Sequence, residues 1–251
     1  MIVTAYKTPK IVVGSDLFAT LDVCLSKLQK ESIVVVTSKI VSICQGRVIK
    51  NDGTVDKRKL IRREAQLYME EENSTKWGIV LTVKNDTLIA SSGIDESNGN
   101  GYFILWPKNL QKTAAGIWNH LRKKHHVKRS GVIICDSHTT PLRWGVTGIG
   151  IGWCGFEPLN NYINTPDIFG RKLHVTKASV MDGLAAAAVA VMGEGNEQTP
   201  LAVITDVPFV RFTDRPPTPS EIKALHISMT EDIFSPLVNS PLWKKGGQKL
   251  R

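Results

Sequence analysis

Three carboxylates in the sequence are suited to binding a divalent cation. Asp95, Asp136 and Glu194 each follow an apolar segment, and a hydroxyl stands directly after the second of them at Ser137. Oxygen atoms of this kind are the ligands that Mg²⁺ and Mn²⁺ prefer. A divalent cation would supply the positive charge that phosphoryl transfer requires. Each residue alone is a weak signal, because an aspartate before a hydroxyl residue often only caps the next segment.

The glycine-rich segment 145–155 contains a literal match to the dinucleotide-binding motif GxGxxG at residues 150–155. That motif binds a dinucleotide only between a strand and a helix. Here Pro158 follows within three residues and no helical pattern begins. We therefore expect these glycines to permit close backbone packing instead. The chain also contains no P-loop motif, no GxSxG and no HExxH.

Strands and helices must position the candidate ligands, and both patterns are present. Buried strands are predicted over 32–37, 132–135 and 201–205. A charged, mostly exposed helix is predicted over 56–72, and two further helices over 110–121 and 179–192. The chain is therefore predicted to be a mixed α/β (α+β) protein. Open sheets of such proteins bind ligands beyond the carboxyl ends of their strands, and the acidic and glycine-containing loops are predicted to lie there.

The composition is that of a globular protein, with 251 residues, 42% hydrophobic and 22% charged. This length allows one large domain or two small lobes. The longest apolar run, 184–192, is far shorter than the roughly 20 residues that a membrane span needs, and the N-terminus does not resemble a secretory signal. The four cysteines form no CxxC pair and are expected to be reduced. We therefore expect a cytoplasmic protein that does not contact a membrane.

The net charge of +9 raises nucleic-acid binding as an alternative function. Much of the positive charge lies in the runs 122–129 and 244–251. No aromatic residues alternate with these basic residues, as a base-stacking surface would require. We therefore favour solvated basic faces over a nucleic-acid site.

Five longer segments occur in an order and spacing that point to one family: SKIVSICQGRVI, SSGIDESN, CDSHTTPLRWGVTGIGIGWCGFEPL, DIFGRKLHVT and AAAAVAVMGEGNEQTP. Together they resemble the coenzyme F420-0:γ-glutamyl ligase family, from Thr8 to about Val207. The resemblance implies an F420 ligase-like fold of two intertwined lobes that forms a homodimer. It places the family domain at 1–212, with 213–251 as a Pro-rich loop and C-terminal extension packed on the same unit.

The resemblance also implies an activity, the formation of an amide bond between L-glutamate and a carboxylate of a coenzyme precursor. The reaction would use GTP (or ATP), two Mg²⁺ or Mn²⁺ ions and a monovalent cation such as K⁺. The acceptor carboxylate would first be phosphorylated, because a carboxylate is a poor electrophile, and the glutamate amine would then displace phosphate. A deazaflavin acceptor (F420-0) and a folate both remain open.

Site residues follow from the resemblance, position by position. The metal positions match Asp95, Asp136, Ser137 and Glu194. Arg143 matches a basic residue expected to contact an anionic substrate, and it is assigned with Asp136 to catalysis. The nucleotide-contacting positions match Thr8, Pro9, Lys10, Ile11, Ser38, Lys39, Asn98, Gly193, Gly195, Asn196 and Glu197.

Three departures from the family pattern bear on the substrate. Ile43 replaces a second lysine, the segment after Ser137 lacks a Gly-Arg pair, and Gly183 stands where an acidic residue is common. Fewer cations beside the substrates would change which polyanion is preferred. Since the metal carboxylates are kept, we expect phosphoryl transfer to be retained. A weakened homologue that only binds nucleotide or cofactor is the alternative.

Overall fold

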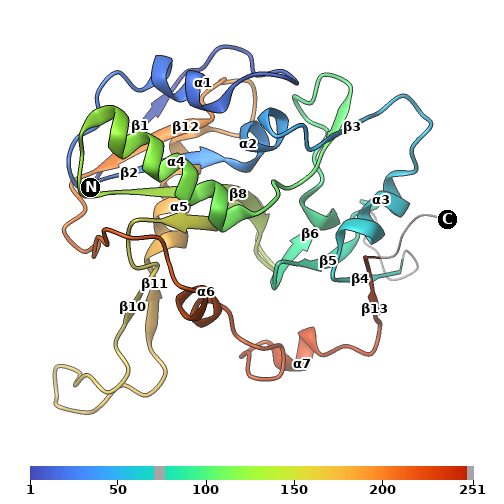
Figure 1. Cartoon of the computed structure of the whole chain (residues 1–251). Coiled ribbons are helices and arrows are strands. Elements are labelled where there is room, and N and C mark those ends of the chain that lie inside the picture. The colour runs from blue at the N-terminus through green and yellow to red at the C-terminus, as the bar shows by residue number, and fades with distance from the viewer. Residues whose placement is uncertain (71–76, 248–251) are drawn as a thin grey trace.

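A five-stranded sheet lies at the centre of the computed structural model, which describes residues 1–70 and 77–247 (Figure 1). Strands β2 and β8 are parallel, and the other neighbouring strands are antiparallel. In spatial order the strands are β1 (Ile2–Tyr6), β12 (Leu201–Thr205), β2 (Ser32–Thr37), β8 (Ser130–Thr139) and β9 (Val146–Cys154). The mixed α/β architecture predicted from the sequence is confirmed.

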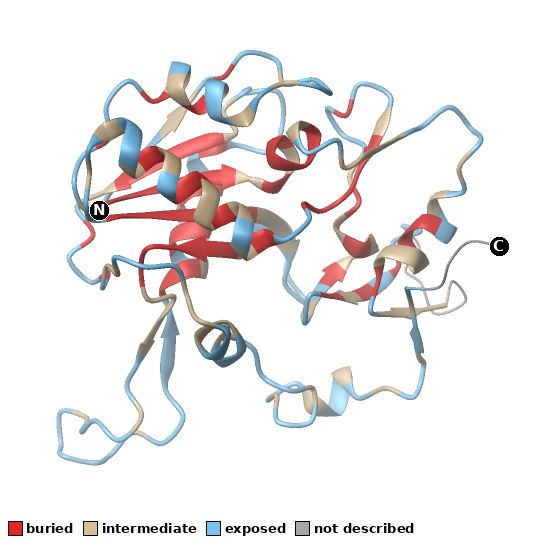
Figure 2. Ribbon diagram, viewed as in Figure 1, coloured by how far each residue is buried: buried red, intermediate tan, exposed pale blue. Residues whose placement is uncertain are grey.

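Helices cover both faces of this sheet, as the buried central strands in Figure 2 show. The helices α1 (Leu17–Cys24), α2 (Ser38–Cys44) and α4 (Leu110–His125) contribute to the core on one face, and α5 (Val180–Met192) covers the other. Val34 and Val36 of β2 belong to the first core, whereas Ile33 and Val35 belong to the second. Burial on both faces explains why β2 is an unbroken apolar run instead of an alternating one.

The glycine-rich segment forms strand β9 and packs directly against α5. A Cβ atom on Gly148 would lie 2.2 Å from the carbonyl oxygen of Ala185, and one on Gly150 would lie 2.4 Å from Cγ of Met181. A larger residue at Gly148 would overlap the backbone of α5, and one at Gly150 would displace the Met181 side chain. Close backbone packing is therefore confirmed. The segment forms a strand, and the described chain continues into strand β10 (Leu159–Asn161), without the helix that a dinucleotide site needs.

A smaller lobe lies beside the central sheet (Figure 1). It contains helix α3 (Lys57–Glu64), the 3₁₀ turn η2 (Ser91–Gly93), the paired strands β3 (Val48–Lys50) and β7 (Tyr102–Ile104), and a four-stranded sheet of β13 (Trp243–Lys245), β4 (Leu67–Met69), β5 (Leu81–Lys84) and β6 (Thr87–Ala90). Its core consists of Leu60, Ile61, Val80, Ile94, Phe103 and Leu105. This lobe carries the segment that contains Asp95.

The segment after β12 connects the two lobes. Helix α6 (Pro219–Leu225) packs Ile222 and Leu225 against the core beneath α5. The chain continues through α7 (Ser235–Val238) to β13, which pairs antiparallel with β4 of the smaller lobe. Strands β10 and β11 (Lys177–Ser179) form a separate hairpin that projects from the larger lobe (Figure 1). The domain boundary at residue 212 and the homodimer stay predictions.

Two sequence predictions of local structure were wrong. The helix predicted over 56–72 ends at Glu64, because Leu67–Met69 form strand β4 and pair with β5 and β13; residues 71 and 72 lie outside the described residues. The strand predicted over 132–135 extends to Thr139, so Asp136 and Ser137 lie within β8 and not after it. In both cases strand pairing, which is not local in sequence, determined where the element ends.

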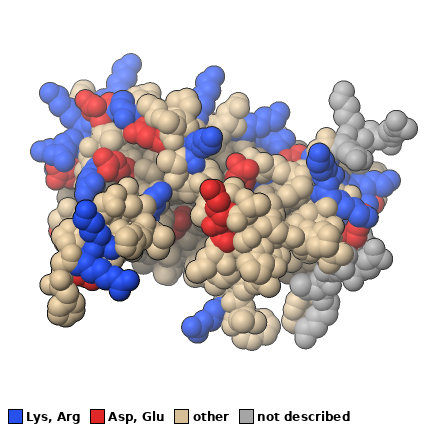
Figure 3. Space-filling model, turned by 90° about the horizontal axis from the view of Figure 1, so that it is seen from below, with Lys and Arg blue, Asp and Glu red and all other residues tan. Residues whose placement is uncertain are grey.

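The basic run at the end of α4 is partly neutralised by its neighbours. Lys124 lies 3.3 Å from Asp22, Arg129 lies 2.9 Å from Glu31, and the Arg122 guanidinium lies 4.2 Å from the centroid of the Trp118 ring. In the face shown in Figure 3, lysines and arginines are interrupted by acidic and uncharged residues. This arrangement fits a solvated surface better than a continuous nucleic-acid site. Among the described residues, no helix is long and apolar enough to cross a membrane.

Candidate active site

A pocket of about 590 Å³ lies at the carboxyl end of β2, where the two lobes meet. Its wall contains all predicted metal and nucleotide residues: Thr8, Pro9, Lys10, Ile11, Ser38, Lys39, Asp95, Asn98, Asp136, Ser137, Gly193, Glu194, Gly195, Asn196 and Glu197. These residues come from five segments that are far apart in sequence. The pocket therefore brings together the residues that the resemblance selected, with the exception of Arg143.

Hydrogen bonds between loops hold the pocket wall together. The Thr8 N–H donates to the carbonyl oxygen of Gln198 at 3.1 Å, and the Gln198 side-chain amide donates back to the Thr8 carbonyl at 2.5 Å. Across the pocket, Nδ2 of Asn98 donates to the carbonyl oxygen of Gly195 at 2.9 Å. The last bond joins a loop of the smaller lobe to a loop of the larger lobe. Gln198 lies in the loop 193–200, which the resemblance matches as a whole to nucleotide-contacting positions, but it was not singled out, because a glutamine in a loop carries no distinguishing signal.

Asp136 lies in the pocket wall, partly accessible and otherwise surrounded by protein atoms. The indole N–H of Trp106 donates to its Oδ2 atom, and the Ser137 N–H donates to Oδ1 at 2.9 Å. Burial raises the pKa of Asp136 to about 6, and these hydrogen bonds together with one from Ser38 only partly oppose that effect. A carboxylate of this kind gains stability from a nearby cation, because the cation compensates for lost hydration.

Asp95 is already paired with a cation of the protein. The Lys39 ammonium lies 2.7 Å from its Oδ2 atom, and the Ser97 N–H donates to Oδ1 at 2.8 Å. Burial alone would raise the pKa of Asp95, but the hydrogen bond and charge of Lys39 outweigh burial and lower this pKa. Lys39 also donates to the Ser97 carbonyl oxygen at 3.1 Å. Lys39 of α2 thus connects the larger lobe to Asp95 and Ser97 of the smaller lobe at the pocket.

The loop after α5 contributes two glutamates with different surroundings. Glu194 accepts a hydrogen bond from the Ser137 hydroxyl at 2.7 Å, which links it to β8. Glu197 accepts from the Gly195 N–H at 2.8 Å, so its carboxylate closes its own loop. A Cβ on Gly193 would lie 2.5 Å from the Glu197 carboxyl carbon, and Gly193 has φ +79°. A glycine is therefore required for this loop to fold over its own glutamate.

The oxygen donors of the pocket are chemically suited to Mg²⁺ or Mn²⁺. Asp136, Ser137 and Glu194 form one connected group, and Asp95 stands opposite with Lys39. Within residues 1–70 and 77–247, however, no three acidic, histidine or cysteine side chains are close enough together to hold an ion. The donor types fit a divalent cation. In this structure, however, Asp95 is paired with Lys39, and Glu194 with the Ser137 hydroxyl.

Two residues singled out from the sequence have different locations. Arg143 is exposed in the loop between β8 and β9 and does not line the pocket. Ile43 is buried and lines the pocket, so a lysine at this position would place a cation in the pocket wall. The role of Arg143 in substrate binding stays a prediction. His138, two residues after Asp136, contacts the carbonyl oxygen of Thr147 at 3.2 Å through Nδ1 and stays within its own hairpin.

Fold and pocket together define a mixed α/β protein with an acid-lined pocket between two lobes. Comparison with known proteins shows that the chain belongs to the F420-0:γ-glutamyl ligase family, because the model of this family matches residues 5–206. It is 36% identical over 200 residues to coenzyme F420:L-glutamate ligase of Methanococcus maripaludis strain S2, covering 74% of this chain and 80% of that protein. The protein of the same name from Methanopyrus kandleri is 30% identical over 241 residues, covering 90% of this chain and 93% of that one. The predicted family and enzyme class, a ligase, are confirmed.

Proposed function

We propose that this ligase joins L-glutamate through an amide bond to a carboxylate of a coenzyme F420 precursor, at the expense of a nucleoside triphosphate. The observation that carries the proposal is the pocket itself. It gathers from both lobes the residues predicted from the resemblance to bind metal and nucleotide, and its volume of about 590 Å³ is within the usual range for small-molecule sites. The names of the related proteins support the choice of glutamate and of a deazaflavin acceptor.

The chemistry requires the acceptor carboxylate to be activated. An oxygen of the acceptor carboxylate attacks the γ-phosphorus of the triphosphate, which gives an acyl phosphate and the nucleoside diphosphate. The glutamate nitrogen then attacks the acyl carbon, the C–O bond to phosphate breaks, and the nitrogen loses a proton. Both steps need the reacting groups to be held close together and away from water, because water would hydrolyse the acyl phosphate.

The protein side chains have separate roles in this proposal. Asp136, Ser137 and Glu194 would hold one divalent cation, and Asp95 would contribute to a second. When bound, Mg²⁺ or Mn²⁺ supplies positive charge beside the phosphate oxygens. Lys39, which now neutralises Asp95 at 2.7 Å, is placed to contact a phosphate once a cation takes over that carboxylate. The loop at 193–200 and the segment at 8–11 would enclose the nucleotide from the larger lobe.

The test is a coupled assay of phosphate release with L-glutamate and Mn²⁺, in which products are weighed by mass spectrometry. GTP and ATP are each combined with F420-0 and with tetrahydrofolate, in K⁺ and in Na⁺ buffer. We expect an F420-0 product heavier by one glutamyl residue, with acceptor-dependent phosphate release. A glutamylated folate and no F420 product would reassign the acceptor. Folded protein that gives no product with either acceptor would refute the proposal and favour a binding-only homologue.

A further inference from the structure

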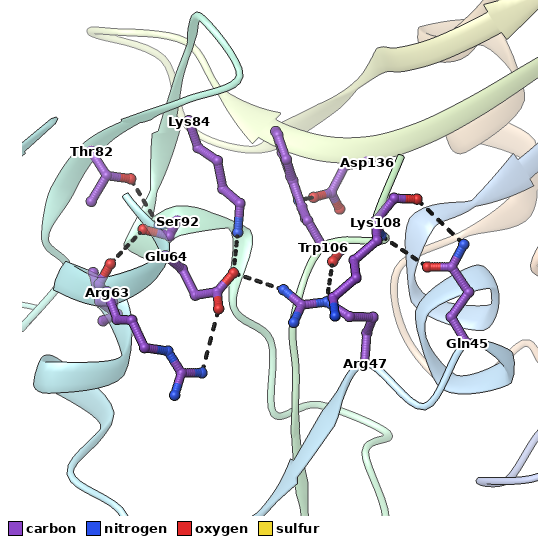
Figure 4. Close-up of polar contacts among 11 residues, drawn as sticks. Gln45, Arg47, Arg63, Glu64, Thr82, Lys84, Ser92, Trp106, Lys108 and Asp136 are labelled. Carbon is purple, nitrogen blue, oxygen red and sulfur yellow. Dashed lines mark hydrogen bonds and ion pairs between the residues drawn. The ribbon is translucent and has the colours of Figure 1, made fainter. Parts of the chain in front are cut away.

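The carboxylate of Asp136 accepts a hydrogen bond from a buried tryptophan, Trp106. Trp106 is 1% exposed, and its indole N–H donates to Oδ2 of Asp136 (Figure 4). The Ser137 N–H donates to the other oxygen. The torsion that turns a carboxylate about its Cβ–Cγ bond is broad and weakly restricted. Two donors on different oxygens fix that torsion. The carboxylate therefore presents its remaining lone pairs in a defined direction.

Trp106 is itself fixed on several sides. A Cβ atom on Gly93 would lie 2.0 Å from the indole Nε1 atom, so the backbone of η2 packs directly against the ring. Nε of Arg47 donates to the Trp106 carbonyl oxygen at 3.1 Å. The Lys84 ammonium lies 5.8 Å from the centroid of the indole ring. The ring has little space in which to tilt, and its N–H direction is set by the smaller lobe.

A half-buried ion cluster anchors these contacts. Glu64 accepts from Arg47 at 2.8 Å and from Lys84 at 3.0 Å through the same oxygen, and Arg63 lies 3.4 Å from the other oxygen. The side chains of Glu64 and Lys84 are only 13% and 9% exposed. The charges of Lys84 and Arg47 outweigh the effect of burial and lower the pKa of Glu64. Figure 4 shows how this cluster lies behind Trp106, on the side away from Asp136.

We infer that Trp106 is a positioning residue for the Asp136 carboxylate, and that the cluster of Arg47, Glu64 and Lys84 holds Trp106 in place. The inference rests on the proposed function, in which Asp136 binds a divalent cation. The indole N–H keeps the carboxylate turned toward the pocket, so the smaller lobe sets the geometry of a ligand in the larger lobe. Partners that orient a metal ligand in this way typically change metal affinity or activity by about 10–100-fold when they are removed.

A purely structural role for Trp106 is the competing explanation, because the residue also belongs to the main hydrophobic core. Trp118 provides a matched control. It lies in the same core, is 1% exposed, and its Nε1 donates to a backbone carbonyl oxygen, that of Ser130, at 2.8 Å. It does not line the pocket. Replacing either tryptophan removes one buried indole N–H and similar volume, but only one of them contacts Asp136.

The experiment measures Mn²⁺ binding to the whole chain by the loss of the free-ion EPR signal, with no nucleotide present. Trp106→Phe is compared with Trp118→Phe, with Asp136→Asn and with the wild-type protein, and thermal melting shows whether each variant folds. We expect the Mn²⁺ Kd of Trp106→Phe to rise by about 10–100-fold, and that of Trp118→Phe to stay within about 2-fold of wild type. In the ligase assay, kcat should fall in Trp106→Phe by a similar factor, with little change in KM for glutamate.

A second variant isolates the hydrogen bond from the ring volume. Benzothienylalanine at position 106 keeps the shape of the indole but replaces its N–H by sulfur, and it should weaken Mn²⁺ binding as the phenylalanine does. Unchanged Mn²⁺ affinity in both 106 variants, with weakened binding in Asp136→Asn, would overturn the positioning role and leave the proposed function intact. Unchanged affinity in Asp136→Asn itself would instead remove the metal assignment, and the inference with it.

Discussion

Asp136 offers a test in which loss of activity should accompany a gain in stability. Burial raises its pKa from 3.8 to about 6. An acid whose pKa is higher in the folded state stabilises the fold below its unfolded pKa, and this contribution is lost as the pH rises through the folded pKa. The difference corresponds to about 3 kcal/mol at pH 8. Because the side chain is partly accessible to the pocket, we expect about 1–2 kcal/mol to be realised.

Asparagine at position 136 stays neutral at every pH and keeps an oxygen that can accept from Trp106. In metal-free protein at pH 8, Asp136→Asn should therefore melt about 2–8 °C higher than wild type, given about 2–4 °C per kcal/mol for a chain of this size. At pH 4.5 the difference should fall to about a third of its value at pH 8, because the folded carboxyl is then largely protonated whereas the carboxyl of the unfolded chain is still largely ionised. The assay is differential scanning fluorimetry in EDTA across this pH range, together with the ligase assay, in which the variant should be inactive.

Asp95→Asn is the matched control, because Lys39 lowers the pKa of Asp95 and the sign of the effect reverses. That variant should melt below wild type at pH 8, and the deficit should shrink as the pH falls toward the pKa of Asp95. An Asp136→Asn variant that melts below wild type at pH 8 would refute the reasoning. The same would follow from a difference between variant and wild type that does not change with pH.

Two further substitutions test the pocket and its support. Ile43→Lys should tighten nucleoside triphosphate binding several-fold at low salt, because Ile43 lines the pocket. Calorimetry measures the Kd, with Ile43→Met as the uncharged control. Equal Kd values for the two variants would show that position 43 does not face the phosphates. Gly93→Ala should cost at least about 2 kcal/mol in urea unfolding, because Gly93 has φ +66° and its Cβ would overlap Trp106. Gly101→Ala has the same strain at φ +81° but open space, so an equal loss there would disprove the overlap.

The sequence was sufficient for elements whose patterns are local. Strand β2 and helix α5 fall almost where periodicity placed them, and Ser179 caps α5 by accepting from the Asp182 N–H. The helix predicted over 56–72 was wrong because Leu67–Met69 is also compatible with a strand, and only pairing with β5 and β13 decides between the two. Such pairings join segments separated by many residues and leave no local periodicity to detect.

The candidate site shows the same division between local and distant signals. Asp95, Asp136 and Glu194 were found because each stands in a short polar segment after an apolar one. Trp106 was missed because its role depends on one hydrogen bond across 30 positions of sequence. Nothing in the surrounding residues distinguishes it from a core tryptophan such as Trp118. Arg143 illustrates the opposite case, since its position in a motif suggested a pocket contact that the exposed hairpin loop does not make.

The pocket lies between two lobes, and the C-terminal segment contacts both of them. The family match ends at residue 206, yet the following residues pack α6 on the larger lobe and add β13 to the sheet of the smaller lobe. That smaller lobe carries Asp95 and the ion cluster that holds Trp106. Movement between the lobes would therefore separate Asp95 from Asp136 and turn the indole N–H at the same time. Because the segment 207–247 joins the lobes, we expect it to restrict the movement to which the proposed chemistry is most sensitive.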